Sequence, residues 1–340
     1  MQMSDEFVSL VKEIGETRSK DEEVAIVQSE VAKLRVLCKA NESMALLTQG
    51  GKKGAKADGA DTARRLRELL VRLVYCEMLG QPVPFGYMLA INCTQFPRLA
   101  VKRAGYLAVS LLVSPDDELN LLNTSTIRKS LESANYLEVC VALNTLCRLV
   151  TAKTVGFFFP VVKELLVKHQ RAVVRKKAVS AVYAMMCTHP DPDDIRGVED
   201  LFRDALCDKD PSVMVATLGI LRELLAREQQ QQQSQQQQQQ QQESNSTGST
   251  GTDSGNISKW VDLVQPLVTI QNQVIGKRLP RGYDYMGMPA PWVQMHLVDL
   301  LGVLGRGNAR ASEKMYECLE STFRAALAYR QSVAAMVVYS

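Results

Sequence analysis

The fold is decided by the stretch from Arg64 to Val113, RRLRELLVRLVYCEMLGQPVPFGYMLAINCTQFPRLAVKRAGYLAVSLLV. Its first part places apolar residues at i, i+3, i+4 and i+7, the spacing of one helix face, and they include Leu66, Leu69, Leu70 and Leu73. Gly80 ends this pattern, and the prolines that follow it prevent the helix from continuing. A second apolar helical pattern comes next and leads into the segment KRAGYL. The stretch therefore predicts a pair of packed helices.

The KRAGYL segment is the first of four similar segments along the chain. When they are aligned on a small residue, alanines lie at positions 104, 142, 178 and 216, which are 38, 36 and 38 residues apart. A polar or turn-like start and another apolar helix precede each segment. A period near 37 residues with two helices per unit is typical of HEAT and armadillo repeats, in which stacking buries the apolar face of each pair. We predict an all-α, HEAT/armadillo-like α-solenoid.

The remaining sequence divides around this array. Residues 1–47 are predicted to form N-terminal helices, either a pair or one long bent helix, with a capping box from Ser19 to Glu22. Residues 48–62 predict a flexible loop, and helical repeats are expected at 63–227 and 259–340. The apolar end of the sequence, without a polar capping repeat, suggests a truncated chain.

A low-complexity insert interrupts the array at 228–258, where thirteen glutamines precede a Ser/Gly-rich run. This composition predicts a disordered insert or a frayed helical extension into the glutamines, because it has too little apolar surface to offset the entropy of ordering. A prion-like assembly element is the alternative.

Composition excludes several classes of protein. Of the 340 residues 46% are hydrophobic and 6% aromatic, with a net charge of +3, which favours aliphatic helix packing and gives no sign of nucleic-acid binding. No apolar run reaches the ~18 residues of a membrane-spanning helix, and the N-terminus has no secretory signal, so a soluble intracellular protein is expected. The eight cysteines form no CxxC pair, and we expect most of them in the core.

No arrangement of residues indicates catalysis. The three histidines are His169, His189 and His296, and none lies beside a nucleophile or at zinc-ligand spacing. We therefore predict no enzyme activity, no metal site and no cofactor.

Two groups of basic residues remain. The first, at 50–72, consists of Lys52, Lys53, Lys56, Arg64, Arg65, Arg67 and Arg72, and the second is Arg171, Arg175, Lys176 and Lys177. Each group is either a solvated face or a surface attracted to an anionic membrane.

Several long runs of the sequence resemble the N-terminal trunk of a large adaptin subunit. They include RLVYCEMLGQPVPFGY at 72–87, NYLEVCVALNTLCRLV at 135–150 and LCDKDPSVMVATLG at 206–219. The run YDYMGMPAPWVQ at 283–294 resembles the epsilon type of the fourth adaptor-protein complex more than the gamma or alpha types. The similarity covers almost the whole chain outside the loop at 48–62 and the glutamine insert.

The resemblance implies a role in vesicle-mediated transport. Large adaptins are α-solenoids that assemble with a beta-type large subunit, a medium (mu) subunit and a small (sigma) subunit. An Arf-family GTPase in its GTP form recruits the complex to trans-Golgi or endosomal membranes, where it selects transmembrane cargo tails. The implied location is cytoplasmic and peripheral on these membranes. The alternatives are a coatomer-like scaffold, a gamma- or alpha-type adaptin, or a truncated fragment that does not assemble.

The resemblance also suggests site residues. In gamma-type adaptins the helix after an FG dipeptide contacts the Arf switch regions, and its apolar positions match Met88 and Ile91 here. Interhelical core is the alternative for both. The phosphoinositide-binding run of alpha adaptins is matched in register mainly by Arg67, so diffuse membrane attraction is expected from the first basic group. A cargo-proximal arginine of the family falls at Gly15, near Arg18.

Overall fold

The computed structural model describes residues 4–49, 58–188, 197–243, 257–306, 309–329 and 336–338. Within them the regular structure is helical, apart from one isolated antiparallel pairing between Tyr285 and Met288. The chain divides into two compact units, Met1–Arg196 and Gly197–Ser340. Among the described helices we find none with the length and apolar character needed to cross a membrane.

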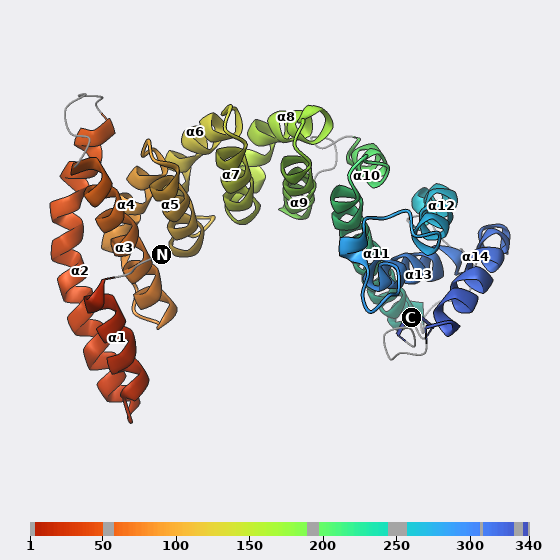
Figure 1. Cartoon of the computed structure of the whole chain (residues 1–340), viewed down its shortest axis with the longest axis horizontal. Helices are drawn as coiled ribbons and strands as arrows, with labels where there is room; N and C mark the ends of the chain where they lie inside the picture. Colours follow the sequence, from red (N-terminus) through yellow and green to blue (C-terminus); the bar gives the residue numbers. More distant parts are fainter. Residues whose placement is uncertain are drawn as a thin grey trace. The chain divides into compact units, whose positions relative to one another are not determined.

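The first unit contains α1 to α9. They are α1 Asp5–Glu16, α2 Lys20–Gln49, α3 Asp58–Met78, the 3-10 turn η1 Pro84–Gly86, α4 Tyr87–Thr94, α5 Leu99–Leu112, α6 Leu119–Leu131, α7 Tyr136–Leu149, α8 Ala152–Lys168 and α9 Ala172–Thr188. Helices α3, α5, α7 and α9 pack in succession, as do α4, α6 and α8, and each layer covers the other (Figure 1). The prediction of an all-α solenoid is confirmed.

The repeats share one close-packed position, and it differs slightly from the one expected. The burial pattern places Gly105, Ala142, Ala178 and Thr217 in equivalent, buried places. The alignment on alanines is therefore wrong by one residue at Ala104 and Ala216. At Gly105 a Cβ atom would lie 2.8 Å from the backbone carbonyl carbon of Cys93 and from the backbone nitrogen of Thr94. Glycine is therefore needed where α5 crosses α4.

Helix α6 buries a polar face. Asn120, Asn123, Thr126 and Ser130 are buried, whereas Leu121 and Leu122 are exposed. The hydroxyl of buried Tyr106 on α5 lies 2.7 Å from Ser130 Oγ and donates to the carbonyl of Thr126 at 3.2 Å. Asn120 donates to the carbonyl of Leu149 at 2.9 Å. These bonds pair buried polar groups of Tyr106, Asn120 and Ser130, which would otherwise destabilise the fold.

The N-terminal helices form a pair. Ser19 Oγ accepts from the backbone N–H of Glu22 at 3.2 Å, and the Glu22 carboxylate accepts from the N–H of Arg18 at 3.2 Å. This capping arrangement starts α2 where the sequence predicts it. Helix α2 continues to Gln49 and α3 begins at Asp58, so both ends of the expected loop at 48–62 are helical and only 50–57 lie outside the described residues.

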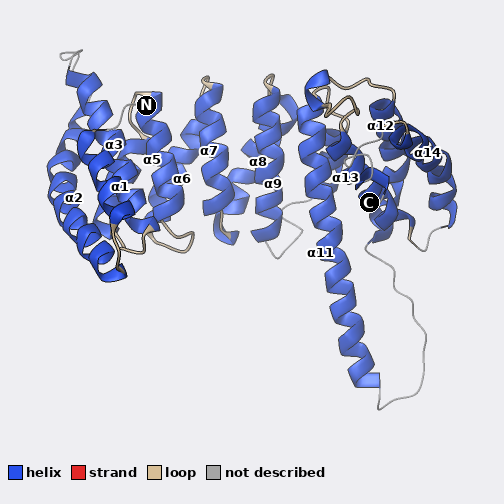
Figure 2. Ribbon diagram, turned by 60° about the horizontal axis from the view of Figure 1, so that its bottom comes forward, coloured by secondary structure: helices blue, strands red, loops and turns tan. Residues whose placement is uncertain are grey.

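The second unit contains the later helices. They are α10 Val198–Leu206, α11 Pro211–Glu243, η3 Ile257–Leu263, α12 Val264–Ile275, η4 Arg281–Tyr283, α13 Pro291–Gly305 and α14 Ala309–Leu327. Helix α11 continues through the glutamine tract to Glu243, as the helical alternative expects (Figure 2). The rest of the insert, 244–256, lies outside the described residues.

The run at 283–294 forms a tight turn and the start of α13. Met286 and Gly287, with φ of 49° and 84°, form the tip between the paired Tyr285 and Met288. Gln294 on α13 donates to the carbonyl of Pro289 at 2.6 Å and accepts from Gln271 of α12. The distinctive run therefore holds two helices of the second unit together.

Candidate functional site

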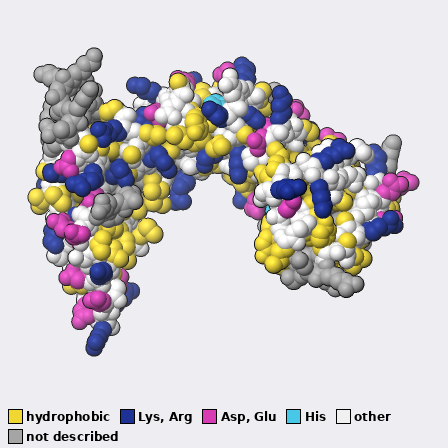
Figure 3. All heavy atoms as spheres, viewed as in Figure 1, with side chains coloured by type: hydrophobic (Ala, Val, Ile, Leu, Met, Phe, Trp, Pro, Cys, Tyr) yellow, Lys and Arg dark blue, Asp and Glu magenta, His cyan; other side chains and the backbone are white. Residues whose placement is uncertain are grey.

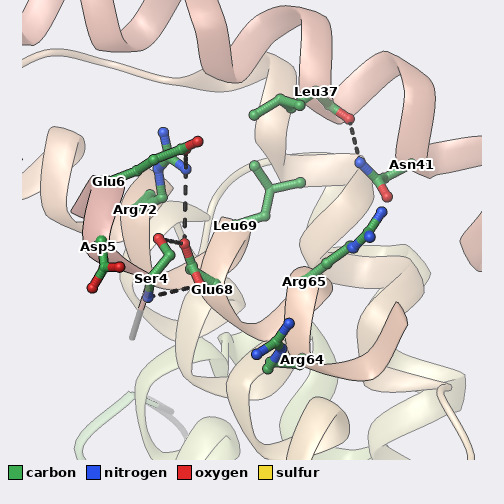
Figure 4. A pocket seen from close by; sticks show the side chains of 10 residues that line it. All are labelled: Ser4, Asp5, Glu6, Leu37, Asn41, Arg64, Arg65, Glu68, Leu69 and Arg72. Carbon is green, nitrogen blue, oxygen red and sulfur yellow. Dashed lines mark hydrogen bonds and ion pairs between the residues drawn. The ribbon is translucent and has the colours of Figure 1, made fainter. Parts of the chain in front are cut away.

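A pocket of about 620 Å³ opens where α1, α2 and α3 meet (Figure 4). The side chains that line it come from the start of α1, the middle of α2 and the central part of α3. They are Ser4, Asp5, Glu6, Leu37, Asn41, Arg64, Arg65, Glu68, Leu69 and Arg72. Leu37 and Leu69 are the apolar residues of this lining, and the others are polar or charged. The pocket thus brings Arg64 and Arg65 of the first basic group together with the N-terminal segment.

One member of the lining is held in a buried ion pair. Arg72 is 8% exposed and its Nη2 lies 2.5 Å from Oε1 of Glu30, which is 3% exposed. Glu6 and Glu68 lie 3.5 and 3.8 Å from Arg72 Nη1. Glu68 also holds the N-terminal segment through Ser4, whose Oγ and backbone N–H donate to its carboxylate. Arg72 therefore ties three helices together and adds no net charge to the surface.

The sequence did not reveal this ion pair. Glu30 and Arg72 are 42 residues apart and lie on different helices. Each one, taken alone, fits the polar pattern of its own helix, so only the packing of α2 against α3 identifies them as partners.

The other basic residues of the group differ in exposure. Arg64 and Arg65 are exposed and pair with Asp61 one turn earlier, at 2.9 and 2.8 Å. Arg67 is half-buried. Lys52 and Lys53 lie outside the described residues. Arg64 and Arg65 share the one carboxylate of Asp61, so an excess of positive charge is left at this place, and its attraction to a membrane stays a prediction.

The FG dipeptide fixes the start of α4. Phe85 lies beneath the guanidinium of Arg35, 5.2 Å from its carbon to the ring centre. A Cβ atom at Gly86 would lie 2.8 Å from Leu73 Cδ1, so the glycine lets η1 pack against α3. The Glu77 carboxylate accepts from the N–H of Val83 at 2.8 Å and fixes the preceding turn.

The two predicted Arf-contact residues lie in different surroundings. Met88 is 40% exposed, whereas Ile91 is 3% exposed and belongs to the core between α3, α4 and α5. The accessible stripe of α4 runs through Met88, Asn92 and Gln95, at i, i+4 and i+7. Of the two residues, Met88 alone presents an accessible side chain on this face. Ile91 occupies the core position that the alternative describes.

Arg18 lies in the link between α1 and α2. Its side chain is exposed, and Gly15, one turn earlier, has open space around its Cα atom. Both positions are accessible from solvent, so the segment is free of the packing that buries Arg72.

Buried thiols in the same unit are held in their neutral form. Burial raises the pKa of Cys93 to about 12 and that of Cys76 to about 11. Glu30 raises the Cys76 value further, and Arg72 opposes it. These cysteines are therefore core residues rather than nucleophiles. In the described part of the chain, no three His, Cys, Asp or Glu side chains gather as a metal site would require.

The fold is an α-solenoid of stacked helix pairs. Residues 48–340 match the family described as the adaptin N terminal region. The chain belongs to this family, and the resemblance seen in the sequence is confirmed.

Individual relatives sharpen the comparison. The chain is 38% identical to the AP-4 complex subunit epsilon of Arabidopsis thaliana, over 94% of the chain and 29% of the relative. It is 34% identical to the AP-4 complex subunit epsilon-1 of Homo sapiens, over 94% and 24%. It is 36% identical to the AP-4 complex subunit epsilon of Dictyostelium discoideum, over 98% of the chain and 30% of the relative. The chain therefore spans less than a third of the length of these relatives.

A structural neighbour agrees on the fold. A homology model of the full-length AP-3 complex in an intermediate open conformation superposes with a TM-score of 0.52, over 81% of this chain and 43% of the other. The sequence identity is 17%, so this likeness supports the α-solenoid fold alone.

Proposed function

We propose that the chain is the N-terminal part of an epsilon-type large subunit of a heterotetrameric adaptor complex. The observation that carries this proposal is the 38% identity to an AP-4 epsilon subunit across 94% of the chain. In this proposal the helical layers bind a beta-type large subunit, a medium subunit and a small subunit. The complex serves vesicle-mediated protein transport as a scaffold and has no catalytic role.

Membrane recruitment and cargo selection complete the proposed function. A GTP-loaded Arf-family GTPase recruits the complex to the trans-Golgi network or endosomes, where it collects transmembrane cargo tails. Arg18, exposed between α1 and α2, is the proposed cargo-proximal residue. Arg64, Arg65 and Arg67 line or adjoin the α1–α3 pocket, where they add diffuse attraction to an anionic leaflet.

Co-expression with a sigma-type small subunit tests the assembly. An adaptin trunk is expected to co-purify with the small subunit as a stable complex. If the chain remains folded but alone, it is a different solenoid scaffold or a fragment that does not assemble.

The proposed Arf contact is tested at Met88. We expect the complex with the small subunit to bind Arf loaded with GTP and not with GDP in a pull-down. Met88→Asp should abolish this binding, because it places a charge on the exposed stripe of α4 without disturbing the core. Ile91→Asp is unsuitable, since it would bury a charge and unfold the helix.

Met78→Asp is the matched control, because Met78 is 75% exposed at the end of α3. It should leave Arf binding unchanged. If Met88→Asp retains GTP-selective binding while both variants keep their helical circular dichroism, the contact does not lie on α4.

A further inference from the structure

Basic residues lie at the starts of two helices of the first unit, α5 and α9. Short links reverse the chain between α5, α6, α7, α8 and α9, so the starts of α5, α7 and α9 lie along the same edge (Figure 2). The repeat register that aligns Gly105 with Ala142 and Ala178 also aligns Arg98 with Asn135 and Arg171. The same register aligns Arg103 with Cys140 and Lys176. The outer repeats therefore carry cations at equivalent places.

These cations stand where a helix disfavours them. Arg98 is the N-cap residue of α5 and makes no side-chain capping bond. Arg171 precedes α9, and its carbonyl accepts from the N–H groups of Val174 and Arg175, as that of an N-cap residue does. Neither α5 nor α9 has an acidic residue in its first turn. The positive end of each helix dipole thus meets further positive charge.

In the middle repeat, the start of α7 has the residues that usually stabilise a helix N-terminus. Asn135 caps α7 by accepting from the N–H of Leu137 at 3.1 Å, and Glu138 follows in the first turn. Nothing in the fold requires arginine at the corresponding places in α5 and α9. An unfavourable cation at the N-terminus of a helix, found at equivalent positions in two repeats, is typical of a functional surface.

Neighbouring charges do not neutralise this edge. Glu138 pairs with Lys102 at 2.7 Å, and Glu164 pairs with Lys168 at 3.0 Å. We define the basic edge as Arg98, Arg103, Arg171, Arg175 and Lys176. Among the described residues, the ion pairs of the first unit do not include Arg98, Arg103, Arg171 or Lys176. The edge therefore carries a local excess of positive charge.

Apolar side chains lie among these cations. Tyr136, Leu137 and Val173, at the starts of α7 and α9, are exposed. The guanidinium carbon of Arg171 lies 5.3 Å from the centre of the Tyr136 ring, which joins the two helix starts. Figure 3 shows Lys and Arg side chains interspersed with apolar ones on the viewed face of this unit. Cations beside exposed tyrosine and aliphatic side chains suit the boundary between lipid headgroups and acyl chains.

We propose that the basic edge binds the anionic surface of a membrane. The cations at the starts of α5 and α9, with α7 between them, are about 20 Å apart at the usual 8–10 Å between packed helices, a span that exceeds the Debye length of about 8 Å. Such a row matches an extended charged surface better than a single small anion. A nucleic-acid strand is less suited, because Tyr136, the exposed aromatic side chain at the start of α7, is already stacked on Arg171. The choice of a membrane as partner rests on the proposed function.

The test uses the full chain and vesicles of phosphatidylcholine with about one part in five of phosphatidylserine. The variant combines Arg98→Asn, Arg103→Gln, Arg171→Asn and Lys176→Gln. A basic residue near the surface contributes about fivefold to binding, so the loss of four should weaken vesicle binding by about 600-fold. Its thermal midpoint should stay the same or rise, because asparagine is a better N-cap than arginine.

The matched control replaces four exposed lysines of the same unit, Lys12, Lys33, Lys39 and Lys153, with glutamine. It changes the net charge equally and should keep most of the vesicle binding. Equal losses in the two variants would overturn the proposal, as would wild-type chain that ignores phosphatidylserine. Binding of single-stranded RNA that exceeds vesicle binding and depends on the same four residues would also overturn it.

Co-purification with the small subunit separates this inference from the proposed function. A chain that assembles normally but does not bind the vesicles refutes the basic edge alone. Failure to assemble refutes the adaptor role, whatever the vesicles show.

Discussion

The contact between α4 and α5 at Gly105 allows a quantitative test of the fold. In Gly105→Ala the new Cβ would lie 2.8 Å from two backbone atoms of α4 and 3.0 Å from Cys93 Cβ. Backbone cannot rotate away as a side chain does, so the two helices must separate. Overpacking of this kind costs up to about 3 kcal/mol. Alanine recovers about 1 kcal/mol of that because it favours the helix more than glycine.

The net loss for Gly105→Ala is therefore about 2 kcal/mol. For a unit of this size it lowers the thermal midpoint by about 4–8 °C. Gly156→Ala is the matched control, because Gly156 is helical and a Cβ there meets nothing within 4 Å. It should raise stability by up to about 1 kcal/mol. Circular dichroism during heating measures both variants, and a midpoint for Gly105→Ala at or above that of the wild type would refute the close approach.

Three further predictions concern buried polar and ionisable groups. Glu30→Gln should lower the unfolding free energy by about 3–5 kcal/mol in urea titrations, since Arg72 would keep a buried charge without its closest carboxylate; a loss below 1 kcal/mol would contradict the ion pair. Cys93, whose pKa is raised to about 12 by burial, should react with Ellman's reagent only on unfolding, whereas exposed Cys207 should react at once; equal rates would contradict the packing. Burial, with Arg222 nearby, lowers the pKa of His296 below 6.5, so the folded state binds this proton more weakly than the unfolded state. The stability that neutral His296 contributes should therefore be complete above pH 6.5 and be lost as the pH falls below it. In urea titrations, the unfolding free energy of His296→Gln should fall less between pH 7 and pH 5 than that of the wild type.

The solenoid followed from the sequence because each helix of the array carries a clear apolar face. The period near 37 residues also followed, since it repeats with the packing unit. The register was harder, because an alanine beside the true contact looks like the contact itself. Only burial distinguishes Gly105 from Ala104 and Thr217 from Ala216.

Polar faces were less predictable than apolar ones. Helix α6 turns Asn120 and Ser130 inward because Tyr106 of α5 and the carbonyl of Leu149 at the end of α7 supply partners. No periodicity within α6 shows those partners, and its exposed leucines would suggest the opposite orientation.

The candidate sites divide in the same way. Met88 lies on the surface as a contact residue must, but Ile91 is turned into the core because the exposed stripe of α4 advances by four residues. In the sequence Arg72 belongs to a basic group, but its role in the core depends on Glu30 of another helix. Long-range pairings of this kind decide charge at a site and are invisible to local patterns.

Assembly with a small subunit is the most direct test of the proposed adaptor role. The chain and a sigma-type subunit would be co-expressed, purified and passed over a sizing column with light scattering. An adaptin trunk predicts one peak with the mass of one copy of each. Separate peaks from two folded proteins would contradict the assignment to an adaptor complex.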